Sequence, residues 1–255
     1  MNPKIHRYFI ECAYDGTAYN GWQIQPNGTG VQQVIEEALH TLLRQICPIL
    51  GSGRTDTGVH ARQQFAHVDL PEMNEKSIHQ LIFKLNNILP EDITIRGIYP
   101  VKSTAHARFD ALRRTYKYYL SFKKDAFAYR HQYYYRGTLN MQSMEAAAAI
   151  IPQYTDFSSF CKSHAASQTP FCKVDTSFWE ETEHGWVYTV SADRFLRNMV
   201  RAIVGTMIEV GKGKISPDEI HSIIEQKDRR AAGFSAPANG LFLHRVEYPE
   251  GTFLT

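Results

Sequence analysis

The sequence predicts an α+β protein made of two similar halves. Runs of alternating apolar residues, typical of strands, are interspersed with runs whose apolar residues have helical spacing. The long parallel βαβ succession of a nucleotide-binding fold is missing from this pattern. With 255 residues, of which 43% are hydrophobic and 12% aromatic, the chain is long and apolar enough to bury a core.

The first half follows the order strand, helix, strand, helix, strand. Thr29 and Gln32 have the spacing of a capping box at the start of its first helix. Ser77 and Gln80 open its second helix, and Pro90 stops it. The expected elements are a strand at 5–14, a helix at 31–43, a strand at 64–70, a helix at 77–89 and a strand at 92–99.

The second half repeats this order loosely. Pro152 ends its alanine-rich helix, and Gly211 with Gly213 ends the most strongly periodic helix of the chain. Ser216, Pro217 and Glu219 have the spacing of an N-cap, a first-turn proline and a capping-box acid. The expected elements are strands at 116–122, 173–180, 186–191 and 241–248, and helices at 141–151, at 195–208 and from 216 onward.

The basic residues are concentrated in the second half, although the net charge is only +2. Between Arg194 and Lys214, five Lys or Arg stand against one Glu. Tyrosines are interleaved with these cations, a pattern that fits RNA binding; the alternative is an ordinary solvated surface. Between His106 and Gly137, two Asp stand against eight basic residues: Arg108, Arg113, Arg114, Lys117, Lys123, Lys124, Arg130 and Arg136.

The remaining composition predicts a cytoplasmic protein with reduced thiols. The four cysteines, Cys12, Cys47, Cys161 and Cys172, show no CxxC spacing. No apolar run has the length of a signal peptide core or of a membrane span. The eleven histidines form no local metal-ligand pattern, so we expect no metal.

An Arg-x-Asp pair stands in the glycine-rich stretch GSGRTDTGVHA at 51–61. In an extended segment, residues two apart point the same way, so Arg54 and Asp56 could face one cavity. The alternative is a salt-bridged turn. The DTG triplet at 56–58 is also that of aspartic proteases, but these enzymes need two facing aspartates and the chain has a single DTG.

Arginines are also expected on one side of the helix at 195–208. At 100° per residue, Arg194, Arg197 and Arg201 lie opposite the face formed by Phe195, Met199 and Ile203. Arg197 and Arg201 are four residues apart and repel each other mildly. Such a pair is favourable when an anion lies across it.

Six segments, in the same order, resemble sequence blocks of the tRNA pseudouridine synthase A family. GRTDxGVHA is the most specific of these motifs, and the resemblance covers nearly the whole chain. Ser52, Thr57, Lys173 and Asn198 depart from the usual family residues, the last two in segments expected to contact RNA. The segments are YDGTAYNGWQIQPN at 14–27, GSGRTDTGVHARQQFAHVD at 51–69, RFDALRRTYKY at 108–118, DFSSF at 156–160, FLRNMVRAIVGTMIEVGKGK at 195–214 and APANGLFLHRVEY at 236–248.

The resemblance implies an isomerase that converts uridine to pseudouridine at positions 38, 39 and 40 in the anticodon stem-loop of tRNA, without cofactor or metal. It also implies a homodimer and two sub-domains that share a mostly antiparallel mixed sheet flanked by helices. We expect an N-terminal sub-domain at 1–104 with the Asp56 loop and a C-terminal one at 105–255 with the basic segments. The rival reading is a non-catalytic RNA-binding protein of the same fold.

Roles for individual residues follow as hypotheses. The Asp56 carboxylate attacks C1′ of the ribose, attacks C6 of the base or removes the C2′ proton. Arg201 keeps Asp56 ionised, Tyr116 stacks on the uracil, and Arg54 either intrudes into the space of the flipped base or holds its phosphate. Contacts to the RNA backbone are expected from Arg108, Arg113, Arg114, Lys117 and Arg197.

Overall fold

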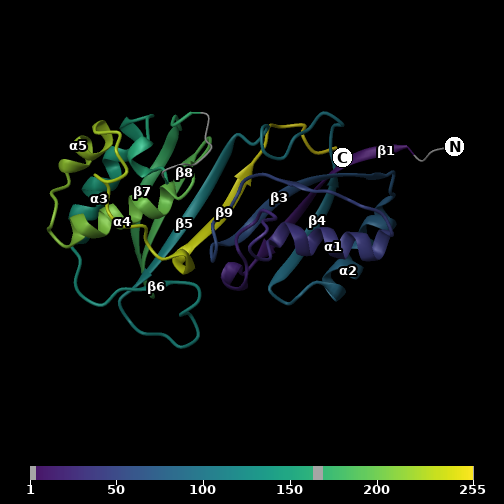
Figure 1. Ribbon diagram of the computed structural model, residues 1–255, viewed down its shortest axis with the longest axis horizontal. Coiled ribbons are helices and arrows are strands. Elements are labelled where there is room, and N and C mark those ends of the chain that lie inside the picture. The colour runs from purple at the N-terminus through teal and green to yellow at the C-terminus, as the bar shows by residue number, and fades with distance from the viewer. Residues whose placement is uncertain (1–3, 163–168, 255) are drawn as a thin grey trace. The chain divides into compact units, whose positions relative to one another are not determined.

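The chain forms two compact units in the computed structural model, which describes residues 4–162 and 169–254 (Figure 1). Unit 1 comprises Met1–Leu112 and Leu243–Thr255, and unit 2 comprises Arg113–Phe242. Each unit combines antiparallel strands with α-helices. The α+β class expected from the sequence is therefore confirmed.

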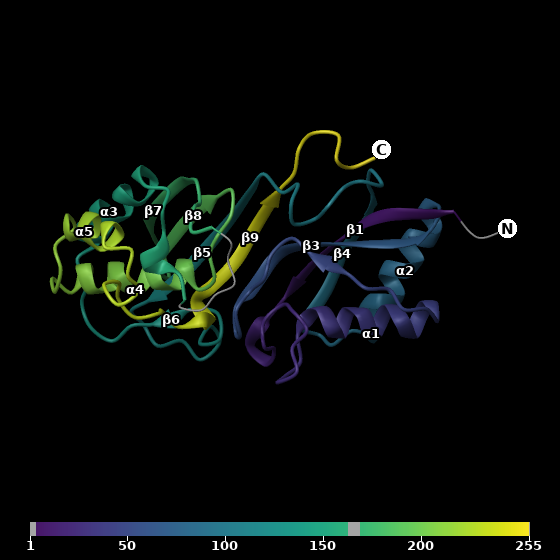
Figure 2. The ribbon, with the colours of Figure 1, turned by 45° about the horizontal axis from the view of Figure 1, so that its top comes forward.

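In unit 1, the central strand β1 pairs antiparallel with β3 on one side and β4 on the other. The short β2 pairs with β3, and β9 follows β3 in the strand order. Helices α1 and α2 lie next to each other against these strands (Figure 2). The elements of this unit are β1 (Ile5–Tyr14), α1 (Val31–Leu43), β2 (Leu50–Gly51), β3 (His60–Pro71), α2 (Glu75–Ile88), β4 (Ile93–Pro100) and β9 (Leu241–Glu247).

Strand β1 is buried on both faces. Phe9 and Ile10 are both fully buried, although adjacent strand residues point to opposite faces. On the Phe9 face, the rings of Tyr248 and Phe253 lie 5.0 and 5.9 Å from its ring. The C-terminal segment thus completes the core of unit 1.

This packing explains why the units differ from the expected division into 1–104 and 105–255. The Tyr248 hydroxyl donates a hydrogen bond to the Ala107 carbonyl at 2.6 Å, and the Leu112 amide donates to the Glu247 carbonyl at 2.8 Å. Residues 105–112 and 243–255 therefore belong with unit 1. The interlocking segments are far apart along the chain, so a boundary drawn at a single position does not describe them.

In unit 2, β8 lies between β5 and β7 and is antiparallel to both, whereas the short β6 runs parallel to β5. Helix α3 packs on α4 and on β7 (Figure 2). The elements are β5 (Arg113–Ser121), β6 (Tyr133–Tyr134), α3 (Met141–Ile150), β7 (Val174–Thr182), β8 (Gly185–Ala192), α4 (Met199–Gly211) and α5 (Glu219–Glu225).

Capping residues were expected at three helix starts, and two of these predictions are wrong. Helix α1 begins at Val31 as expected, but Gly30 precedes it without a side-chain cap, and the Gln32 side-chain amide donates to the Ile49 carbonyl at 2.9 Å. Helix α2 begins at Glu75, because the Asn74 side chain caps it by accepting from the Ser77 amide at 2.9 Å. At the last helix, a Glu219 carboxylate oxygen accepts from the Ser216 amide at 2.6 Å as expected, but α5 begins at Glu219 with Asp218, not Ser216, as its N-cap residue.

The expected row of arginines on the helix at 195–208 is also wrong. Helix α4 begins only at Met199, and the preceding Asn198 adopts the left-handed conformation with φ of 67°. Asn tolerates this conformation better than most residues, and its side-chain amide donates to Ser235 Oγ at 2.7 Å. Arg194 and Arg197 therefore lie outside the helix that carries Arg201.

A buried imidazole makes the stability of unit 1 dependent on pH. His67 on β3 is only 6% exposed, and its Nδ1 accepts a hydrogen bond from the Ala107 amide at 3.2 Å. The His106 ring lies 4.5 Å away. Burial, reinforced by the nearby cationic charges of His106 and Arg7, lowers the pKa of His67 to about 4.

We expect the free energy of unfolding to fall as the pH drops from about 6.5 to about 4, because only the unfolded chain binds the His67 proton in that range. The loss assigned to His67 is about 1–3 kcal/mol. Urea unfolding at both ends of this range measures it. The loss should shrink in His67→Gln, which can still accept from Ala107, and persist in the exposed control His79→Gln. Equal pH dependence in all three proteins would contradict this assignment.

Candidate active site

The loop between β2 and β3 carries Asp56, and its first residues are fixed by hydrogen bonds to β3. The Ser52 amide donates to the Phe65 carbonyl at 2.6 Å. The Ser52 hydroxyl bonds to the side chain of Gln64, whose amide donates in turn to the Gly53 carbonyl at 2.9 Å. Ser52 and Gln64 are both buried, so these contacts are shielded from water. Ser52, one of the departures from the family pattern, thus helps to hold the loop.

Thr55 anchors the backbone immediately before Asp56. It is buried, and its hydroxyl lies 2.9 Å from the hydroxyl of Tyr14 on β1. Its carbonyl accepts a hydrogen bond from the Trp22 amide at 3.3 Å. The side chain and the backbone of Thr55 are therefore both fixed, while the next side chain, Asp56, is half-buried.

A tight turn fixes the backbone after Asp56. Gly58 has φ of 78°, which glycine adopts without strain, and its amide donates to the Tyr19 carbonyl at 3.3 Å. The Val59 amide donates to the Asp56 carbonyl at 3.1 Å. Asp56 thus lies between two anchored residues on a backbone that has little freedom to move.

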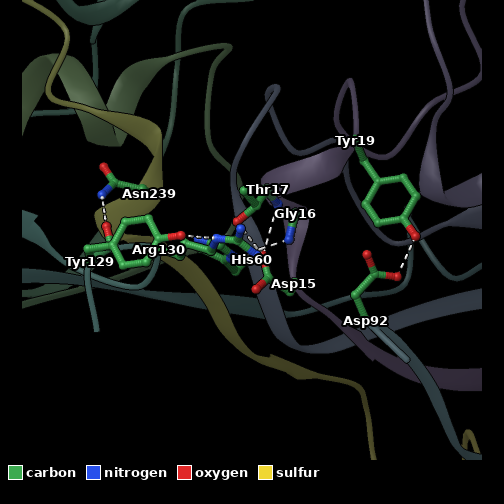
Figure 3. Close-up of polar contacts among 9 residues, drawn as sticks. All are labelled: Asp15, Gly16, Thr17, Tyr19, His60, Asp92, Tyr129, Arg130 and Asn239. Atoms are coloured by element: carbon green, nitrogen blue, oxygen red, sulfur yellow. Dashed lines mark hydrogen bonds and ion pairs between the residues drawn. The ribbon is translucent and has the colours of Figure 1, made fainter. Parts of the chain in front are cut away.

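A second group of contacts secures the start of β3 (Figure 3). The fully buried His60 places its Nδ1 3.0 Å from the Gly16 amide and 3.0 Å from an Asp15 carboxylate oxygen. That oxygen also accepts from the Thr17 amide at 2.9 Å. A Cβ at Gly16 would lie 2.0 Å from the Val59 carbonyl oxygen, so only glycine allows this approach. The YDGT segment is therefore part of the support of the Asp56 loop.

Tyr19 connects the same support to the start of β4. Its hydroxyl donates to an Asp92 carboxylate oxygen at 2.5 Å (Figure 3). Burial, together with this hydrogen bond, raises the pKa of the Tyr19 phenol above its usual value. The phenol therefore stays protonated and donates this hydrogen bond. The bond fixes Tyr19, whose backbone carbonyl accepts from the Gly58 amide.

Arg54 and Asp56 do not form the salt-bridged turn that the sequence left open. Arg54 is exposed and, within the described ranges 4–162 and 169–254, forms no ion pair. Its side chain is available for an external anion.

The other two central candidates belong to unit 2. Tyr116 on β5 is 8% exposed, and its ring meets that of Phe195 edge to face at 5.0 Å. The half-buried Arg201, in the first turn of α4, donates from Nε to the Ala236 carbonyl at 2.6 Å. Both side chains are held in place inside their own unit, and their approach to Asp56 stays a prediction.

The five residues proposed to contact the RNA backbone differ in accessibility. Arg114 is buried and donates to the Asp193 carbonyl at 2.6 Å, and Lys117 pairs with Glu180 at 3.5 Å. Arg108 and Arg197 are exposed, and Arg113 is exposed but paired with Asp175 at 3.1 Å. Arg108, Arg113 and Arg197 are therefore more accessible to solvent than Arg114 and Lys117.

The site carries the Asp56 carboxylate on a loop fixed by hydrogen bonds, in a protein whose second unit holds a basic and aromatic stretch. Such a combination fits an enzyme that acts on a nucleic acid by acid–base or nucleophilic chemistry. Comparison with known proteins gives the particular class. The family model described as tRNA pseudouridine synthase matches residues 12–110 and 154–249, and the chain belongs to this family. It is therefore an isomerase that forms pseudouridine from uridine in tRNA.

Curated relatives agree with this assignment over nearly their whole length. A protein named tRNA pseudouridine synthase A from Bacteroides fragilis is 50% identical over 98% of this chain and 99% of its own. The Porphyromonas gingivalis protein of the same name is 48% identical over 97% and 99%. One from Bacillus subtilis is 39% identical over 94% and 98%. Among the described residues, no helix is long and apolar enough to span a membrane.

Proposed function

We propose that this chain modifies uridines at positions 38, 39 and 40 of the tRNA anticodon stem-loop, with Asp56 as the catalytic carboxylate. The observation that carries the proposal is the support of Asp56: Thr55 before it and Gly58 two residues after it are hydrogen-bonded to buried residues, and the motif around it is a highly specific family segment. A reaction that needs one accurately placed carboxylate is served by such a loop.

The chemistry explains why a single carboxylate can suffice. The N1–C1′ bond breaks, the uracil turns, and a C5–C1′ bond forms; C5 loses its proton and N1 gains one. Nothing is added to the nucleoside and no electrons are transferred, so we expect neither a cofactor nor a metal. The target base must first leave the helix, which costs a few kcal/mol.

Three roles are open to the Asp56 carboxylate: attack at C1′, attack at C6 and removal of the C2′ proton. Only the last breaks a C2′–H bond. A substrate deuterated at C2′ would therefore react more slowly if C–H cleavage limits the rate. This experiment separates removal of the C2′ proton from the two nucleophilic roles without altering the protein.

Arg201 is proposed to keep Asp56 ionised, and Tyr116 to stack on the flipped uracil. A neighbouring guanidinium lowers a carboxylate pKa by about 1–3 units. Arg54, being exposed, is the candidate for the vacated base position or the flipped phosphate. Arg108, Arg113 and Arg197 are the accessible candidates for the RNA backbone, and we assign Arg114 and Lys117 weaker contributions because intramolecular contacts engage them.

Replacing Arg201 by Gln is expected to lower kcat/KM by about 10²-fold, because the Asp56 carboxylate would lose the cationic partner proposed to hold it. The control is Arg230→Gln, which removes an exposed arginine paired with Asp228. Unchanged kcat/KM in Arg201→Gln would contradict the proposed pairing.

We further propose a cytoplasmic homodimer. The four cysteines are free thiols, which supports a reducing compartment. Sedimentation of the purified chain tests the dimer.

Mapping of the product tests the proposed positions. An unmodified tRNA transcript with uridines at 38, 39 and 40 is incubated with the protein, and pseudouridines are marked chemically and located by reverse transcription. Stops at these positions are expected. Modification confined to another part of the tRNA would contradict the proposal.

A further inference from the structure

The segment that follows β5 and includes β6, residues 122–136, has an aromatic and basic surface that the isomerisation chemistry does not use. Phe127 is 96% exposed and Tyr129 57% exposed, which is rare for large rings. Four cations belong to the same segment, against the single acid Asp125: Lys123, Lys124, Arg130 and Arg136. We refer to residues 122–136 as the aromatic loop.

The aromatic loop is held in a defined shape. The Tyr135 amide donates to the Ser121 carbonyl at 2.8 Å and closes its base. The side-chain amide of Asn239 donates to the Tyr129 carbonyl at 2.9 Å (Figure 3) and to the Gln132 carbonyl at 2.7 Å. These contacts fix the backbone before any partner binds, which lowers the entropy cost of binding.

Local contacts also fix the tip of the aromatic loop and leave its aromatic rings exposed to solvent. Asp125 accepts from the amides of Phe127 and Ala128 at 2.7 and 3.3 Å, so its charge is directed to the backbone. Arg130 donates from Nε to the Tyr129 hydroxyl at 2.8 Å (Figure 3). The Phe127 ring is thus presented to solvent by an ordered turn.

We propose that the aromatic loop binds tRNA by stacking Phe127 on an unpaired base, with Lys123 and Lys124 on the adjoining phosphates. This inference rests on the proposed function and adds a contact surface to it. Every base has a face on which an aromatic ring stacks, and flanking cations neutralise the backbone. Within the described residues, Lys123 and Lys124 are exposed and their ammonium groups form no ion pair.

The charge favours RNA over a protein partner. Protein interfaces are depleted in lysine, particularly at their centre, whereas phosphate-binding surfaces are rich in it. The exposed Phe127 is flanked by a lysine pair on one side and by Arg130 on the other. If the aromatic loops of two copies of this chain met, the four cations of one loop would repel the four of the other.

The test measures the affinity for unmodified tRNA of the full chain carrying Asp56→Asn, which prevents turnover. Adding Phe127→Ala should weaken binding by about 5- to 100-fold, the range measured for loss of one stacked base. Phe127→Trp should restore the affinity, and Phe127→Leu should not. The matched control is Phe83→Ala on α2, which removes another exposed ring, 69% accessible, and should change nothing.

Salt dependence and a second probe separate the two parts of the contact. Lys124→Ala should reduce the slope of log K against log salt by about 0.7–0.9, whereas Phe127→Ala should leave it unchanged. A blunt-ended, fully paired RNA duplex should bind Phe127→Ala and its parent equally, because it offers no unpaired base.

Unchanged tRNA affinity in Phe127→Ala, or full rescue by Phe127→Leu, would overturn the stacking contact. A change from dimer to monomer in Phe127→Ala would overturn it in favour of a protein interface. The proposed function is tested separately: it fails if the wild-type chain, with Asp56 intact, forms no pseudouridine.

Discussion

Replacing Asp56 by Asn is expected to lower the rate of pseudouridine formation by about 10³-fold or more, because acid–base chemistry alone contributes about 10²–10⁴-fold and the carboxylate is the proposed reacting group. Asn has nearly the same shape, so the loop held by Thr55 and Gly58 should keep its conformation. The rate is followed by chromatography of nucleosides from digested tRNA.

Two controls accompany this variant. Its affinity for unmodified tRNA and its free energy of unfolding should stay close to those of the wild type, since the side chain is half-buried and the substitution conserves volume. Thr57→Ala, which changes an exposed side chain next to Asp56, should keep the activity of the wild type. Full activity in Asp56→Asn would show that another group performs the reaction.

Replacing Gly21 by Ala is expected to damage both stability and activity. Gly21 has φ of 80°, and a Cβ there would lie 2.2 Å from the Thr55 carbonyl oxygen and 3.1 Å from the Asp56 carbonyl carbon. The backbone of the Asp56 loop would have to move. We expect a loss of about 2–4 kcal/mol in urea unfolding, from the left-handed conformation and the overpacking together, and a large fall in kcat.

Gly213 provides a matched control for this effect. Its φ is 71°, close to that of Gly21, but a Cβ there would have nothing within 4 Å. Gly213→Ala should therefore cost only the conformational part, about 1 kcal/mol, and leave kcat unchanged. If Gly21→Ala and Gly213→Ala behaved alike, the close approach of Gly21 to the Asp56 loop would be irrelevant to catalysis.

The elements with a clear period could be predicted from the sequence. Strand β1 and helix α1 have the expected bounds, since alternation and helical spacing directly reflect which side chains are buried. The start of α4 was wrong because Asn198 leaves the helical conformation, although the apolar spacing continues through Phe195. The short strands β2 and β6 were not predicted, because two residues carry no period.

The composition of unit 1 depends on contacts between segments that are far apart in the sequence. Tyr248 and Phe253 join the core of unit 1 through contacts with Phe9, across most of the length of the chain. No local pattern reports such a pairing. Periodicity describes the faces of an element but does not say which distant face covers it.

At the candidate site, the sequence singled out Asp56 through its motif, whereas the residues supporting it were missed. No pattern in the sequence marks Tyr14, Tyr19 and His60 as supports, and only the structure shows that they hold the Asp56 loop. The exposure of Phe127 was missed in the same way, because an aromatic residue in a sequence is normally expected to be buried.

The most direct test of the catalytic assignment follows the C5 proton. Unmodified tRNA labelled with tritium at C5 of uridine is incubated with wild type and with Asp56→Asn side by side. The account predicts release of tritium to water by the wild type and none by Asp56→Asn. Release by both would contradict the role of Asp56, and release by neither from a tRNA with uridines at positions 38, 39 and 40 would contradict the proposed substrate positions.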